Sequence, residues 1–146
     1  MPNATPLLVD VRGPRFAAWI TSVVLAVVLL TGNVALLLVQ ALVFALGAFL
    51  GLRWHPYGAL FRVLVAPRLG PVREREPESP PRFAQYVGLI FAVVGVVGYA
   101  LGSPVVGATA TGLALAAALL NAATGFCLGC ELYLIVRRML PARTTA

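Results

Sequence analysis

Lysine is absent from this chain of 146 residues, and charged side chains of every kind make up only 11% of it. A soluble globular domain has roughly 25% charged residues and no long apolar runs. The scarcity of charge, together with 60% hydrophobic residues, therefore predicts an integral membrane protein. All eleven basic residues are arginine, and no basic face with interleaved aromatic residues predicts nucleic-acid binding. The lipid bilayer is the expected partner of these arginines.

The sequence also lacks the motifs of several enzyme classes. It contains no glycine-rich phosphate loop, no Ser-His-Asp set and no carboxylate pair, so hydrolase and kinase chemistry has no support. No cofactor is predicted. The side chains that remain as candidates for chemistry are a single histidine, His55, and two cysteines, Cys127 and Cys130.

The first long apolar run extends from Phe16 to about Leu52 and is interrupted only by Thr31-Gly32-Asn33. As one helix it would be far too long for a single crossing of a ~30 Å hydrocarbon core. Because Gly-Asn favours a turn, the run predicts two helices, at about 15–32 and 34–52.

The second half of the chain predicts two more spans. A third helix is expected at about 83–101. The apolar run 105–136 would be about 48 Å long as one helix, more than one span needs. We therefore expect a break near Thr124-Gly125, a fourth span at about 105–124, and an interfacial C-terminal segment at 126–140.

The arginines predict how these helices cross the membrane. Basic residues lie before the first helix, in the polar and proline-rich loop 53–82, and after the last helix, while the turns 31–33 and 102–104 have none. The positive-inside rule then places both termini and the central loop in the cytoplasm. The prediction is a single integral domain over residues 1–146 in the cytoplasmic membrane. The arginines are Arg12, Arg15, Arg53, Arg62, Arg68, Arg73, Arg75, Arg82, Arg137, Arg138 and Arg143.

A short motif occurs twice, as Pro-Arg-Phe-Ala-Ala-Trp at 14–19 and Pro-Arg-Phe-Ala-Gln-Tyr at 81–86. Pro suits the first turn of a helix, and Arg with Trp or Tyr anchors a helix end at the membrane interface. Aromatic, arginine-containing stretches at 54–64 and 132–140 are expected to form short interfacial helices. The predicted fold is all-α, with four spans as two helical hairpins. The hairpins are either a tandem repeat about a pseudo-twofold axis or a product of convergent anchoring.

Small and amide side chains within the spans are explained by helix packing. Gly47 and Gly51 form Gly-x-x-x-Gly, and Gly112 lies among alanines, patterns that let helix backbones approach closely. Gln40 and Asn121 are the amides expected within the bilayer, where hydrogen bonding between helices is their default role and a transport path the alternative.

Cys127 and Cys130 form a Cys-x-x-Cys pair at the cytoplasmic end of the fourth predicted span. A permanent structural disulfide is not expected there, because the cytosol is reducing. One interpretation is a redox or sulfur-relay pair, in which Cys127 attacks and Cys130 resolves the mixed disulfide. This chemistry requires the chain to break near Gly125, because at the C-terminus of an unbroken helix, and beside Glu131, a thiolate would be disfavoured.

Two other interpretations remain open. Cys127 and Cys130 suit a soft metal ion, and His55 is predicted on the same membrane face, but a closed site needs a further ligand. His55 is alternatively an ordinary interfacial residue. The cysteines are alternatively small apolar fillers at positions i and i+3 of one helix face.

Several segments together resemble the bacterial domain-of-unknown-function 4395 family. They are residues 9–16 (Val-Asp-Val-Arg-Gly-Pro-Arg-Phe), 56–58 (Pro-Tyr-Gly), 81–85 (Pro-Arg-Phe-Ala-Gln) and 125–133 (Gly-Phe-Cys-Leu-Gly-Cys-Glu-Leu-Tyr). The resemblance covers nearly the whole chain and implies a small four-helix membrane protein. Genes of that family often neighbour genes for thioredoxin-like proteins and sulfurtransferases, which implies sulfur or redox handling by association.

The leading hypothesis is thus a membrane protein that handles thiol/disulfide or sulfur transfer through Cys127 and Cys130. Its expected partner is a cytosolic thioredoxin-like protein or sulfurtransferase. The alternative is a non-enzymatic module, either a transporter of soft metal or sulfur compounds or an assembly subunit. A bundle with so little mass outside the membrane is also a candidate for homo-oligomer formation.

Overall fold

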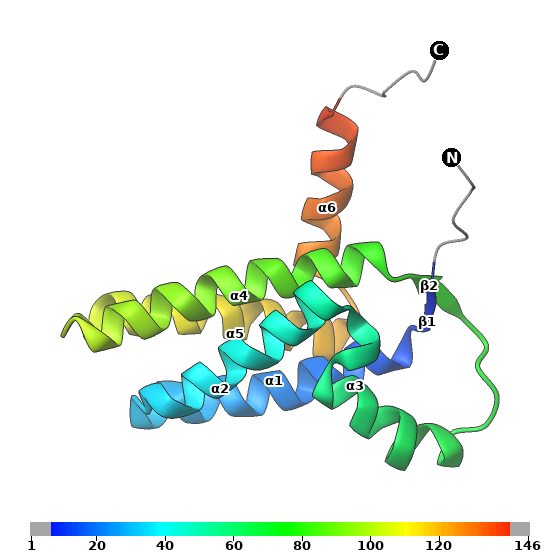
Figure 1. The fold of residues 1–146 in the computed structure, drawn as a ribbon, viewed down its shortest axis with the longest axis horizontal. Helices are drawn as coiled ribbons and strands as arrows, with labels where there is room; N and C mark the ends of the chain where they lie inside the picture. Colours follow the sequence, from blue (N-terminus) through cyan, green and yellow to red (C-terminus); the bar gives the residue numbers. More distant parts are fainter. Residues whose placement is uncertain (1–6, 141–146) are drawn as a thin grey trace.

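The computed structural model describes residues 7–140, which are mostly helical (Figure 1). Long helices lie side by side in a bundle, and a further helix projects from it near the end where the described chain begins. The bundle helices are α1 (Arg12–Thr31), α2 (Val34–Ala45), α4 (Ser79–Ala100) and α5 (Pro104–Thr124), and the projecting one is α6 (Leu128–Met139).

Three of these helices, α1, α4 and α5, are long and apolar enough to cross a membrane. The shorter α2 continues into a π-helical turn, η1 (Leu46–Leu50), so that the apolar helix from Val34 to Leu50 is about 25 Å long at 1.5 Å per residue. The structure therefore supports a membrane protein with three clear candidate spans, where the sequence predicts four.

Local sequence explains where the helices begin and end. Gly32 adopts a left-handed conformation (φ 65°) that ends α1, and the side chain of Asn33 accepts the Leu36 N–H at 3.1 Å to cap α2. Helices α1 and α4 begin three to four residues earlier than predicted. The prolines at 14, 80 and 81 lie in their first turns, where the missing N–H costs no hydrogen bond.

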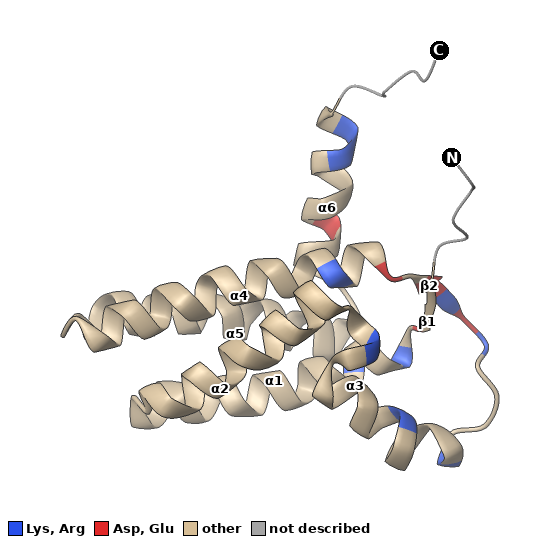
Figure 2. Ribbon diagram, viewed as in Figure 1, with Lys and Arg blue, Asp and Glu red and all other residues tan. Residues whose placement is uncertain are grey.

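Charged side chains of the described residues gather at one end of the bundle and on α6 (Figure 2). The turns that join α1 to α2 and α4 to α5 lie at the opposite end, without charge. Arg143 lies outside the described residues. The arrangement agrees with the segregation of arginine along the sequence.

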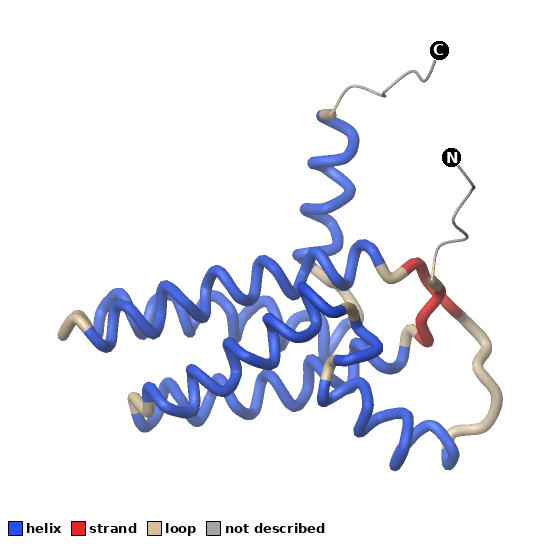
Figure 3. Tube along the Cα trace, in the orientation of Figure 1, coloured by secondary structure: helices blue, strands red, loops and turns tan. Residues whose placement is uncertain are grey.

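The segment predicted as the loop 53–82 is largely structured. It contains the short helical turns η2 (Leu52–Trp54), α3 (Pro56–Leu60), η3 (Phe61–Val65) and η4 (Ala66–Arg68), followed by strand β2 (Arg75–Pro77). Strand β2 pairs antiparallel with β1 (Leu8–Asp10), with Val9 opposite Glu76 (Figure 3). The all-α prediction missed this pair because three-residue strands are too short to show an alternating pattern.

Glycine has different packing roles from those predicted. The close approach of α4 to α5 occurs at Gly98, where a Cβ atom would lie 2.6 Å from the Gly107 nitrogen. Gly112 has open space beside it, so the prediction of a close helix approach there is wrong. Gly47 instead makes room for the side chains of His55 and Gln85, since a Cβ there would lie 2.7 Å from His55 Cδ2.

The apolar core lies between helices of the two halves of the chain. Its buried members include Leu25, Leu37, Phe44 and Ala92. Helix α1 packs on α5, α2 packs on α4, and α4 also packs on α5 and on α6. Segments far apart in sequence are thereby brought together at the charged end of the bundle.

Candidate functional site

The chain breaks between α5 and α6, as the redox interpretation requires. Helix α5 ends at Thr124, and Gly125 follows in a left-handed conformation (φ 78°), where its N–H donates to Asn121 O. The Thr124 hydroxyl accepts the N–H of Phe126 at 3.2 Å. The next helix, α6, begins at Leu128.

This break places the cysteines at the start of a helix. Cys127 is the N-cap of α6, in an extended conformation, and its Sγ accepts the N–H of Cys130 at 3.1 Å. The two sulfurs form a disulfide, with their Cα atoms 5.1 Å apart. In the reduced state the N–H of Cys130 and the positive end of the helix dipole would stabilise negative charge on Sγ of Cys127.

Helix α6 is held on α4 by a glycine between the cysteines. A Cβ atom at Gly129 would lie 2.6 Å from the Cβ of Ala84, so any larger residue would push α6 away from α4. The rings of Phe83 and Tyr133 pack beside this point with their centroids 5.6 Å apart. The third residue of Cys-Leu-Gly-Cys is thus required by packing against α4.

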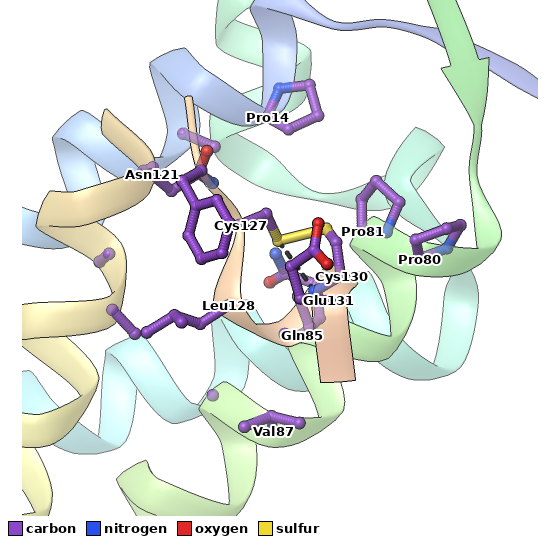
Figure 4. Close-up of a pocket in the computed structure, with 18 of the residues that line it drawn as sticks. Pro14, Pro80, Pro81, Gln85, Val87, Asn121, Cys127, Leu128, Cys130 and Glu131 are labelled. Atoms are coloured by element: carbon purple, nitrogen blue, oxygen red, sulfur yellow. Dashed lines mark hydrogen bonds between the residues drawn. A yellow bond between two sulfur atoms is a disulfide. The ribbon is translucent and has the colours of Figure 1, made fainter. Parts of the chain in front are cut away.

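Both cysteines line a cavity of about 780 Å³ (Figure 4). Its walls come from α1, α4, α5 and the segment 125–134. Figure 4 shows Gln85, Asn121 and Glu131 around the disulfide. The sequence singled out Asn121 and Glu131 but gave no role to Gln85, which follows the second Pro-Arg-Phe-Ala motif directly.

Two arginines hold helix ends that are distant in sequence. Arg15 donates from Nε to Ala122 O at 3.0 Å and from Nη2 to Ala123 O at 3.1 Å, at the C-terminus of α5. Arg82 donates from Nε to Ala48 O at 2.7 Å and from Nη2 to Phe49 O at 2.9 Å, at the end of the helix that α2 and η1 form. Each guanidinium satisfies carbonyls that a helix end leaves without partners. Arg15 thereby supports the residues immediately before the cysteines.

His55 is not brought into the cavity that contains Cys127 and Cys130. It lines a second cavity, of about 540 Å³, and its side chain is only 2% exposed. Gly58 N–H donates to His55 Nδ1 at 3.4 Å, so Nε2 carries the hydrogen and donates to Gln85 Oε1 at 3.1 Å. Within residues 7–140 no group of three or more His, Cys, Asp or Glu side chains is arranged to hold a metal ion.

Gln40 has a hydrogen-bonding role of the kind expected for a buried amide. Its Oε1 accepts the hydroxyl of Tyr57 at 2.8 Å, and the side chain is fully buried. Tyr57 in turn packs edge-to-face on His55, with ring centroids 5.3 Å apart. Gln40, Tyr57, His55 and Gln85 therefore form one polar cluster between α2, α3 and α4.

Acidification is expected to destabilise the protein through His55. Burial lowers the pKa of His55 from 6.5 to about 4, and the hydrogen bond to Gln85 opposes this shift. The unfolded chain therefore binds a proton that the folded protein does not bind between pH 4 and 6.5. The free energy of unfolding is therefore highest above pH 6.5. It decreases by roughly 3 kcal/mol as the pH falls from 6.5 toward 4.

Thermal unfolding of the detergent-solubilised protein across this pH range measures the effect. His55→Asn is the matched variant, because asparagine also caps a helix N-terminus but does not titrate. Its unfolding temperature should depend less on pH between 4 and 6.5 than that of the wild type. Equal pH dependence of the two proteins would contradict the assignment to His55.

A comparison with models of protein families identifies the family of this chain. The family model described as "Domain of unknown function (DUF4395)" matches residues 9–138, which include both cysteines, His55 and both Pro-Arg-Phe-Ala motifs. No curated protein and no solved structure matches the chain.

Proposed function

Because the chain belongs to the DUF4395 family, whose description names no activity, we propose its function from the geometry of the cysteine pair. The proposal is a membrane protein that exchanges thiols and disulfides with a cytosolic thioredoxin-like partner through Cys127 and Cys130. The observation that carries it is the position of Cys127 as the N-cap of α6, directly after a break in the chain. A buried filler would need neither the break nor the cap.

The exchange proceeds by two attacks at sulfur. A thiolate of the reduced partner attacks Sγ of Cys127, the Cys127–Cys130 bond breaks, and Sγ of Cys130 leaves as a thiolate that takes up a proton. The second thiolate of the partner then attacks the partner's own sulfur in the mixed disulfide and releases Cys127. Two electrons and two protons pass to the protein, and the partner becomes a disulfide. In the reverse direction Cys127 is the nucleophile and Cys130 resolves the mixed disulfide.

Exposure of the site suits a macromolecular partner. Cys127 and Cys130 are partly exposed, and the neighbouring Phe126 and Leu128 are each 45% exposed. Apolar side chains beside a reactive disulfide give a partner protein surface to pack against while sulfur is attacked. The same surface would serve a sulfurtransferase, whose persulfide also presents a sulfur nucleophile.

We further infer four spans with both termini cytoplasmic. Three long helices and the apolar helix Val34–Leu50 have lengths compatible with the bilayer core. Charged residues of the described chain lie at one end of the bundle and on α6, which agrees with the positive-inside rule if that end is cytoplasmic (Figure 2). Helix α6 ends in Arg137 and Arg138 and projects from this end, a position that suits the membrane interface.

Contacts made by the two motifs favour a tandem repeat. Arg15 of the first motif caps the end of α5, and Arg82 of the second caps the end of the helix that α2 and η1 form. Each hairpin thus begins with an arginine that closes the last turn of the other hairpin. Convergent anchoring at a membrane interface does not explain this reciprocity.

The segments after the hairpins also correspond. His55 Nδ1 and Cys127 Sγ each accept the N–H of the residue three positions later. Six residues after each of these caps is an aromatic ring, Phe61 or Tyr133, that packs on the phenylalanine of the motif in its own half. In this correspondence the cysteine site occupies in the second half the place that His55 occupies in the first.

Reactivity of the folded protein tests the proposed exchange. Detergent-solubilised protein is equilibrated with thioredoxin or glutathione redox buffers and then alkylated without denaturant. The expected result is a reversible transition between two free thiols and none, read by the mass shift, with Cys127 alkylated first. If the pair neither opens in reducing buffer nor reacts until the protein is unfolded, the cysteines are structural and the proposal fails.

Single-cysteine labelling in intact cells tests the orientation. In a background with Cys127→Ser and Cys130→Ser, a thiol from Leu101→Cys should react with a membrane-impermeant maleimide. A thiol from Arg68→Cys should react only after the cells are opened. Labelling in the opposite pattern would invert the proposed topology.

A further inference from the structure

The cavity beside the disulfide extends into the membrane-spanning part of the bundle. Its lining follows α1 from Pro14 to Thr21, α4 from Ala84 to Phe91, and α5 from Asn121 back to Leu113. At 1.5 Å per residue, these stretches of about two turns extend the cavity about 11 Å along the helices. A small molecule that reached the disulfide through this cavity would keep part of its body at membrane depth.

The cavity is lined mostly by apolar side chains in its deep part and by several polar side chains elsewhere. The deep lining includes Ala18, Phe44, Phe91, Leu113 and Ala114. The polar side chains of the lining include the guanidinium of Arg15, the amides of Gln85 and Asn121, and the carboxylates of Glu74, Glu76 and Glu131. This combination fits a ligand with a long apolar part and a head group that accepts hydrogen bonds.

Thr21 adds a hydroxyl group to the deep part of the cavity wall. It is 5% exposed and lines the cavity, whereas the buried side-chain atom without a hydrogen-bond partner within residues 7–140 is Nε2 of Gln40. The neighbouring Ser22 bonds to the carbonyl of Ala18, and Thr111 bonds to that of Gly107. The Thr21 hydroxyl can donate a hydrogen bond to a ligand carbonyl in the cavity.

We propose that this cavity binds an isoprenoid quinone, which exchanges electrons with the Cys127–Cys130 pair. The inference rests on the proposed thiol exchange, because it supplies the second electron partner of the same site. A volume of about 780 Å³ lies within the range of small-molecule sites and admits a quinone ring with the first part of its tail. The tail would leave between helices into lipid.

The electron transfer balances without another reactant. The two thiols are oxidised as their S–H bonds break and the S–S bond forms. The quinone is reduced as its two carbonyl oxygens gain the two protons and the ring gains two electrons. A cytosolic dithiol would then reduce the disulfide again, so that electrons pass from the cytosolic partner through the cysteines to the membrane quinone.

Reduction of decylubiquinone by the full-length protein in detergent tests this proposal. Reduced protein is freed of excess dithiol and mixed anaerobically with decylubiquinone, and absorbance reports quinol formation while alkylation reports thiol loss. Wild type should form one quinol for each pair of thiols lost, and the double Cys→Ser variant should form none above background. Ala118→Phe, which fills the cavity, should lower this rate at least 10-fold relative to the same variant's exchange rate with dithiothreitol.

The matched control is Ala116→Phe, on the exposed face of the same helix. It should reduce decylubiquinone and exchange with dithiothreitol at wild-type rates. If wild type exchanges with dithiothreitol but does not reduce the quinone, or if the two phenylalanine variants reduce it equally, the quinone proposal is overturned and thiol exchange stands. If the wild-type protein reacts with neither dithiothreitol nor decylubiquinone, both proposals fail.

Discussion

Cys127→Ser is expected to abolish disulfide exchange with thioredoxin or glutathione, while Cys130→Ser should stop the reaction halfway. Only Cys127 caps a helix N-terminus and receives a backbone N–H on its sulfur. Its thiolate is therefore the better nucleophile and also the sulfur that a partner attacks. With Cys130 replaced, Cys127 still forms the mixed disulfide but nothing in the protein resolves it. The rate loss for Cys127→Ser should reach several orders of magnitude.

Mass spectrometry of the product distinguishes the two variants. Incubation with oxidised glutathione should convert Cys130→Ser quantitatively to a stable glutathione adduct and leave the remaining thiol of Cys127→Ser largely free. A relocated thiol is the matched control. Thr124→Cys, in a background without the other two cysteines, places a sulfur at the C-terminus of α5, where the helix dipole disfavours a thiolate. If that thiol reacts as fast as Cys127, the helix position is not the source of reactivity.

Arg15→Ala and Arg82→Ala are each expected to lower the free energy of unfolding by about 2 to 3 kcal/mol. Each variant removes two charge-assisted hydrogen bonds and leaves two helix-end carbonyls to find new partners. The losses should be roughly additive in the double variant, because the two arginines cap different helices. Lysine at either position keeps the charge but not the paired N–H donors, and should restore only part of the stability.

The two arginine variants should differ at the cysteines. Arg15 holds the carbonyls of Ala122 and Ala123, just before the break that presents Cys127, whereas Arg82 holds Ala48 and Phe49 on the other hairpin. We therefore expect Arg15→Ala, more than Arg82→Ala, to change the redox midpoint of the cysteine pair. Arg68→Ala, at an exposed position, serves as the control and should cost less than about 0.5 kcal/mol. Equal stability of all three variants would show that the caps contribute nothing.

The helix ends and the candidate site could be predicted from the sequence because their signals are local. Gly32 and Gly125 each end a helix in a left-handed conformation, at two of the three interruptions that the sequence predicts. The position of Cys127 at the start of α6 follows from the second of these turns and from the length of the apolar run. The pairing of β1 with β2 could not be predicted, since strands of three residues are too short to show an alternating pattern.

The side-chain contacts around the site could not be predicted from the sequence. Gly47 looked like a helix-packing residue, but the structure uses it to admit His55 and Gln85. His55 looked like an interfacial residue or a metal ligand, but burial beside Gln85 keeps it in a separate cavity from the cysteines. A small residue indicates that some neighbour lies close, and only the packed chain decides which neighbour it is.

The sequence by itself determined that this protein belongs in a membrane, where its helices break, and that its two thiols follow the last bundle helix. These properties depend on hydrophobicity and backbone preference over short windows, which neighbouring residues decide. The tertiary structure alone decided that Arg15 caps α5, that Arg82 caps the helix of the first hairpin, and that a cavity runs from the disulfide into the bundle. Arg15 and Ala122 are 107 positions apart, and contacts of that kind depend on how helices pack rather than on any local pattern.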